Sequence, residues 1–150
     1  MKSISIIIII LLFLLPLQTV LAKQKIIGNI KNLTGDVKVV RDNLEFIPVT
    51  GTELFNKDLL KTGPGGGVGI LLLDNTIISL GHDSELKLDK FYFNPSQKTF
   101  SLVTRMVKGT FVFISGLMGK MSPESVELLT PDGSVTIRGT KLAIQVGGDS

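Results

Sequence analysis

Apolar and polar residues alternate along most of the chain after residue 34, and turn-forming residues break the alternation roughly every eight to twelve positions. A period of two places alternate side chains on one face of a β-strand, and Gly, Asn, Asp and Pro favour the turns between strands. Residues 53–60 fit either a strand or a short helical turn. The segments expected as strands are 37–41, 44–46, 68–73, 76–80, 85–93, 99–103, 107–114, 126–129 and the two halves of 134–146.

No window of the sequence sustains an apolar face of helical period with a cap. The pattern therefore predicts a single all-β domain, an antiparallel sandwich or jelly-roll-like fold. The glycine-rich segment 63–67 precedes a strand and has no phosphate-loop lysine, so we expect a mobile turn there. Residues 115–123 are expected as a loop in which Met118 and Met121 form an adaptable contact surface.

The last strand-like segment changes the face of its apolar residues part-way along. These residues have odd numbers up to Ile137 and even numbers from Leu142. A one-residue shift turns every later side chain to the opposite face unless a bulge or bend absorbs it, and a glycine suits such a position. We therefore interpret Arg138, Gly139 and Thr140 as a bulge or corner between sheets, with Arg138 and Thr140 pointing outward. The alternative is that the bulge directs Arg138 toward an anionic ligand or partner.

Residues 1–22 have the layout of a secretory signal peptide. A single positive charge at Lys2 precedes an apolar run over residues 4–15, and small or short residues end at Ala22. The run is shorter than the roughly 20 apolar residues that span a bilayer, although an uncleaved membrane anchor is the alternative. We expect cleavage after Ala22 and a mature domain over residues 23–150, a length that suits one core.

Charge and cysteine content exclude several functions. The chain has 16 basic residues, so removal of Lys2 leaves 15 against 13 acidic residues, a net charge of +2. The basic residues are scattered without a run, which gives no electrostatic footprint for nucleic-acid binding. There is no cysteine, so thiol catalysis and cysteine-ligated metals are excluded.

The sequence offers little catalytic chemistry. His82, the one histidine, lies with Asp83 and Ser84 in a predicted turn, which brings together the three residue types of a hydrolase triad. A triad needs groups that converge from distant segments, so a solvated turn is the favoured interpretation. One histidine without cysteine makes a zinc site improbable, and we expect no cofactor and no metal. Four aromatic residues at strand spacing are expected in the core: Phe91, Phe93, Phe111 and Phe113.

The order of several short motifs resembles the FecR domain, named for the periplasmic regulator of ferric citrate uptake. The resemblance covers about residues 35 to 146. It rests on GDV at 35–37, KTG at 61–63, DNT at 74–76, SEL at 84–86, KG at 108–109, TP at 130–131 and RGT at 138–140. It implies an all-β, non-enzymatic domain in a bacterial envelope without catalytic residues. It also implies that Arg138, Gly139 and Thr140 belong to the framework of the domain.

The resemblance and the residues together give the functional expectations. In the founding regulators the domain follows a cytoplasmic anti-sigma segment and a membrane helix. Here the N-terminus has the pattern of a cleaved signal, which argues against direct sigma-factor control. We expect an exported protein-interaction or signalling-accessory module of the periplasm or cell envelope, with an envelope protein as partner. A cell-wall or glycan-binding module is the alternative, and an exported hydrolase using His82 or a pair of carboxylates is the least favoured.

Overall fold

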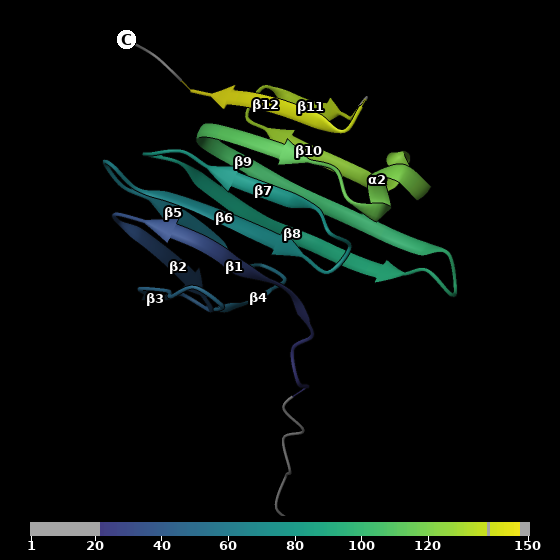
Figure 1. Cartoon of the computed structure of the whole chain (residues 1–150), viewed down its shortest axis with the longest axis horizontal. Coiled ribbons are helices and arrows are strands. Elements are labelled where there is room, and N and C mark those ends of the chain that lie inside the picture. Colours follow the sequence, from purple (N-terminus) through teal and green to yellow (C-terminus); the bar gives the residue numbers. More distant parts are fainter. Residues whose placement is uncertain (1–21, 138, 148–150) are drawn as a thin grey trace, which may run out of the picture.

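The computed structural model describes residues 22–137 and 139–147, which form twelve strands, one short α-helix and one turn of 3-10 helix (Figure 1). The single all-β domain expected from the sequence is confirmed. The signal peptide expected over residues 1–22 lies outside the described residues except for Ala22, and it stays a prediction. The elements are β1 (Ile26–Thr34), β2 (Val37–Arg41), β3 (Leu44–Phe46), β4 (Glu53–Phe55), β5 (Leu59–Thr62), β6 (Gly67–Leu72), β7 (Ile77–Leu80), β8 (Glu85–Asn94), β9 (Thr99–Ile114), α2 (Leu117–Met121), η1 (Pro123–Ser125), β10 (Val126–Thr130), β11 (Gly133–Thr136) and β12 (Lys141–Val146).

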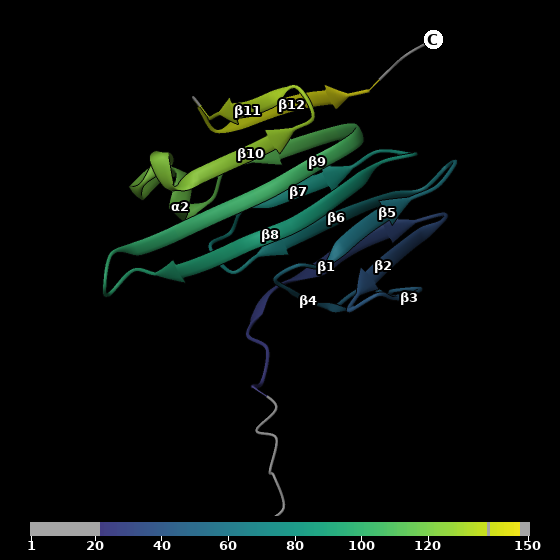
Figure 2. The same ribbon diagram turned by 180° about the vertical axis from the view of Figure 1, so that it is seen from behind.

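The twelve strands are hydrogen-bonded into one sheet that curls into two layers, and the layers share one strand. Sheet A has the order β4-β1-β6-β7-β9-β12, and sheet B has the order β3-β2-β5-β8-β9-β10-β11. Figures 1 and 2 show that β10, β11 and β12 lie at one end of the domain, and β3 and β4 lie at the other. All pairs are antiparallel except β9 with β10, which run parallel. The parallel pair is possible because α2 and η1 provide the long crossover that it requires.

The shared strand β9 changes its buried face at Gly109. Leu102, Thr104 and Met106 point into the core before this position, and Phe111 and Phe113 point into the core after it. Before the change β9 pairs with β8 in sheet B, and after it β9 pairs with β7 and β12 in sheet A. The sequence pattern predicts two separate strands here, and the structure instead has one strand of 16 residues.

Most of the inward-facing residues expected from the alternation are in the core. Phe111 and Phe113 are buried, as expected, and so is Phe91. The register between β8 and β9 shifts between Leu88 and Lys90, so the buried residues of β8 have even numbers before this bulge and odd numbers after it. Phe93 is only partly buried and packs on Phe100, with 5.6 Å between ring centroids.

The alternation fails to predict β1 and α2. The register of β1 against β6 shifts between Ile30 and Asn32, and this irregularity hides the period of two from a reading of the sequence. The helix α2 has five residues, too few to show a helical period. The expected contact surface of two methionines is wrong, because Met118 is buried in the core, and Met121 alone is exposed.

An ion pair between Arg41 and Asp58 fastens β2 to the turn between β4 and β5. The guanidinium donates from Nε and Nη2 to the two carboxylate oxygens, both at 2.8 Å. The Asp58 side chain is 1% exposed, and it also accepts a hydrogen bond from the amide of Phe55 at 2.9 Å. The Arg41 guanidinium lies 4.4 Å from the ring centroid of Phe55 and 5.3 Å from that of Phe46. The hydrogen bond with Asp58 raises the pKa of Arg41 above its usual value.

We predict that Asp58→Ala lowers the free energy of unfolding by about 3 kcal/mol, because it leaves a partly buried guanidinium unpaired. Denaturant unfolding followed by circular dichroism measures the change. Glu45→Ala is the matched control, since its ion pair with Lys38 is about half exposed and such exposed pairs contribute little to stability. Equal losses from the two substitutions would contradict the role given to Asp58.

We predict that Gly109→Ala lowers the free energy of unfolding by about 2 kcal/mol or more. Gly109 has a φ of 103°, and a Cβ atom there would collide with Ser84. Gly51→Ala is the control, because Gly51 also has a positive φ of 90° but has open space around it. It should cost about 1 kcal/mol from backbone strain alone. A thermal unfolding series that finds equal costs would show that the contact with Ser84 is unimportant.

Candidate functional site

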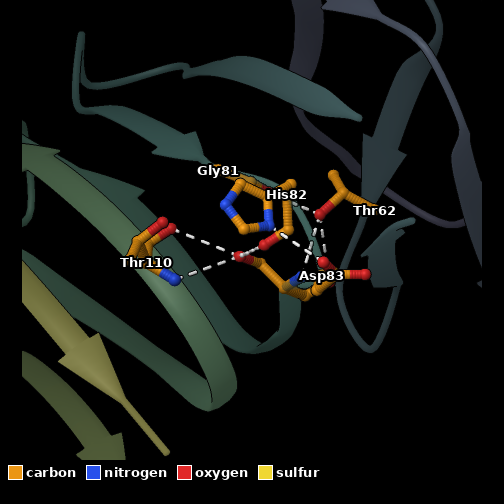
Figure 3. A network of polar contacts seen from close by, with 6 residues as sticks. Thr62, Gly81, His82, Asp83 and Thr110 are labelled. Atoms are coloured by element: carbon orange, nitrogen blue, oxygen red, sulfur yellow. Dashed lines mark hydrogen bonds and ion pairs between the residues drawn. The ribbon is translucent and has the colours of Figure 1, made fainter. Parts of the chain in front are cut away.

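The turn between β7 and β8 contains the three residues considered as a triad, and its hydroxyl network is shown in Figure 3. Ser84 is completely buried. Its Oγ accepts a hydrogen bond from the Thr110 amide at 3.1 Å and donates to the carbonyl oxygen of His82 at 3.1 Å. The Ser84 amide donates to Oγ1 of Thr62 at 2.9 Å, and this hydroxyl donates to the carbonyl oxygen of Gly81. The network therefore joins β5, β9 and the turn.

His82 and Asp83 are on the outside of this turn. Nδ1 of His82 lies 2.8 Å from Oδ2 of Asp83, and their side chains are 73% and 57% exposed. The hydrogen bonds of the Ser84 hydroxyl all go to main-chain groups. The bond between nucleophile and base that defines a triad is therefore missing in this turn, and Ser84 has a structural role.

Gly139 and Thr140 lie where the chain leaves sheet B and enters sheet A. β11 before them pairs with β10, and β12 after them pairs with β9. Gly139 has a φ of 105°, a conformation that glycine adopts without strain, and the Thr140 carbonyl accepts a hydrogen bond from the Ser115 amide at 2.8 Å. Arg138 itself lies outside the described residues, so its expected role as framework or anion contact stays a prediction.

A shallow hollow of about 590 Å³ lies over the outer face of sheet A. Ser79 of β7, Val112 of β9 and Ala143 of β12 are opposite one another in register across its centre. Gly81 and Thr110 contribute to the same lining, so the hydroxyl network of the turn supports one side of the hollow. The lining consists of Ser79, Leu80, Gly81, Thr110, Phe111, Val112, Ala143, Ile144 and Gln145.

The lining of the hollow is uncharged. None of its lining residues carries an ionisable side chain, and they are apolar, small or neutral polar. Removing such groups from water costs less free energy than removing charged groups. No sequence pattern indicates this surface, because the register that aligns Ser79, Val112 and Ala143 joins three strands distant in sequence.

The described part of the chain shows no cluster that suggests a metal or a membrane span. Within residues 22–137 and 139–147, no three His, Cys, Asp or Glu side chains are grouped so that they could hold a metal ion. None of the helices in these ranges has the length and apolar character of a transmembrane segment.

We predict that Ser84→Ala lowers the free energy of unfolding by about 2 kcal/mol, because it leaves the Thr110 amide without its acceptor. His82→Ala should change it by less than about 0.5 kcal/mol, because the ring is exposed and bonds only its neighbour. Urea unfolding of both variants measures the difference. A larger loss from His82→Ala would mean that the histidine has a role the turn geometry does not provide.

The chain is similar to a solved structure and to a protein family. One solved structure, named "Cell surface anchoring domain", is 31% identical, with a TM-score of 0.40, and the match covers 42% of this chain and 84% of that one. None of the curated proteins compared with the chain matches it. The model of the family described as "FecR protein" matches residues 58–150. This match covers more than half of the chain and includes β5 to β12, the hydroxyl network and the hollow, so the chain belongs to the FecR family.

Proposed function

We propose that this chain is an exported, non-enzymatic FecR domain that binds another protein of the bacterial envelope. It would act there as an interaction or signalling-accessory module. The observation that carries the proposal is the hollow on sheet A, whose neutral side chains suit contact with a protein better than they suit chemistry. Membership of the FecR family supports an envelope function.

The hollow is built on strands rather than on loops, which favours binding without rearrangement. Ser79, Val112 and Ala143 are held by the ladders of β7, β9 and β12. A concave patch on a rigid sheet can accept an apolar side chain of a partner and exclude water around it. In this proposal, residues 1–22 direct export and residues 23–150 form the binding domain.

The cell-wall or glycan-binding alternative has less support. Glycan binding on a β-domain usually uses an open aromatic face, and the described residues offer Tyr92 as the exposed aromatic ring. Tyr92 is 37% exposed, and Nζ of Lys25 lies 5.7 Å from the centroid of its ring. Co-sedimentation with peptidoglycan that Tyr92→Ala abolishes would favour this alternative.

We predict that Val112→Arg reduces recovery of an envelope partner at least about tenfold in crosslinking of intact cells, because it places a charge in the hollow. Val107→Arg is the matched control, since Val107 is on the same strand, outside the hollow and 36% exposed. The full chain with a C-terminal tag is used, and its N-terminus is sequenced in the same sample. A start at Lys23 is expected.

Equal recovery of the partner with Val112→Arg and Val107→Arg would remove the hollow as the binding surface. Recovery of no envelope protein with the unchanged chain would contradict the proposed function. An N-terminus at Met1 would show that the apolar segment remains as an anchor.

A further inference from the structure

The outer edge of β12 is an unpaired strand edge. β12 is the last strand of sheet A, and within the described residues it is hydrogen-bonded to β9 alone. It has six residues, compared with four in β11 and three each in β3 and β4, the other strands that end a sheet. Figures 1 and 2 both place β12 at the end of the domain. A long open edge of this kind is a template for pairing with another strand.

The outer edge of β8 is protected in a way that β12 is not. Beyond its pairing with β5, β8 is covered by the turn that precedes β5. The Phe91 amide donates to Oδ1 of Asn56 at 2.7 Å, and Nδ2 of Asn56 donates to the Phe91 carbonyl at 3.2 Å. This side chain replaces a neighbouring strand at that position.

The hydrogen bonds of β9 show which main-chain groups of β12 point outward. The Ser115 amide donates to the Thr140 carbonyl, so Ser115 and Thr140 face each other as a hydrogen-bonded pair. In an antiparallel ladder such pairs alternate with pairs whose groups point away. On the other side of β9, the Gly81 amide donates to the Thr110 carbonyl. Even-numbered residues of this part of β9 therefore point their main-chain groups toward β7, and odd-numbered residues point theirs toward β12.

Along β12, this alternation directs the N–H and C=O groups of Lys141, Ala143 and Gln145 away from β9. The side chains of these residues are exposed on the outer face of sheet A. Leu142 and Ile144 point toward the core but remain partly exposed, because no strand of residues 22–137 or 139–147 lies beyond β12 in sheet A. The edge therefore has open hydrogen-bonding groups and incompletely covered apolar side chains.

We propose that this edge pairs with β12 of a second copy of the chain, antiparallel, about a two-fold axis at Ala143. In this register Ala143 is opposite Ala143, Lys141 is opposite Gln145, and Leu142 is opposite Ile144. All three outward-directed residues of each copy then find a partner within β12. A centre at Leu142 or Ile144 leaves Gln145 or Lys141 opposite a residue beyond the strand.

The side chains of β12 suit this self-pairing. An axis at Ala143 preserves the alternation, so the apolar Leu142 and Ile144 face the core side together and cover each other. No like charges are opposed, because Lys141 faces a neutral glutamine. A two-fold pairing also closes the edge in both copies at once and leaves neither available for further growth.

The proposal does not rest on the proposed function, because it is carried by the main-chain edge of β12, although Ala143 also lines the hollow beside Ser79 and Val112 of the inner strands. Ala143→Glu and Ala143→Lys test it by placing like charges opposite each other at the axis. The unchanged full chain should be a dimer in sedimentation equilibrium. Each variant should dimerise at least about tenfold more weakly, and a mixture of the two should recover the dimer.

Cysteine variants test the register in a chain that contains no cysteine. Ala143→Cys should form a disulfide-linked dimer, because opposed residues of a hydrogen-bonded pair are about 5.5 Å apart between Cα atoms. Gln145→Cys is the matched control on the same face, and it should not crosslink to itself. A mixture of Lys141→Cys and Gln145→Cys should crosslink between copies.

An unchanged chain that is monomeric at all concentrations would overturn the proposal, as would equal self-crosslinking of Ala143→Cys and Gln145→Cys. A crosslink from Ala143→Cys to a different envelope protein in place of a second copy would also overturn it. Loss of self-pairing with retained capture of a partner would leave the proposed function intact. Capture of no partner by the unchanged chain, with dimers still formed, would remove the proposed function and leave the pairing of β12 intact.

Discussion

The sharing of β9 between two sheets is the constraint on which the rest of the structure depends. A strand that serves both layers must turn its apolar side chains from one sheet's interior to the other's, and a strand of unbroken alternation cannot do this. Gly109 makes the change with a positive φ at a point where Ser84 leaves no room for a Cβ atom. After this residue β9 belongs to sheet A, where it pairs with β7 on one side and with β12 on the other.

The polar groups of the domain mostly serve this framework. Ser84 and Thr62 satisfy main-chain groups around the corner of β9, and Asp58 holds Arg41 against two aromatic rings at the other end. Buried hydroxyls and carboxylates are costly unless they are hydrogen-bonded, so each of them fixes local geometry. This explains why residue types that suggest catalysis in the sequence have structural partners in the fold. Asp74 is a further case, because its buried carboxylate accepts hydrogen bonds from Thr76 and from the Met118 amide at the start of α2.

The surfaces left for binding are main-chain edges and neutral side chains. The hollow at Val112 and the open edge at Ala143 both depend on the part of β9 that follows Gly109. They share Ala143 and Gln145, but the hollow lies on the face of sheet A and the open edge lies along the side of β12.

The sequence by itself determined the all-β class, the turns, most of the inward-facing residues and the family. These depend on local alternation and on residues with special backbone preferences, which can be recognised without knowing what a strand contacts. Even the change of face near Gly139 was visible, because its apolar residues are close together in sequence. The irregular strand β1 and the five-residue α2 were missed, because a bulge and a short length hide their periods.

Only the tertiary structure decided which residues meet. The single strand β9, the parallel pair with β10 and the pairing of Arg41 with Asp58 join segments that no local pattern connects. The hollow and the open edge of β12 arise from the order and register of strands, which are set by long-range packing. The role of a surface in such a β-domain is therefore decided by cross-strand neighbours, and these are distant in sequence.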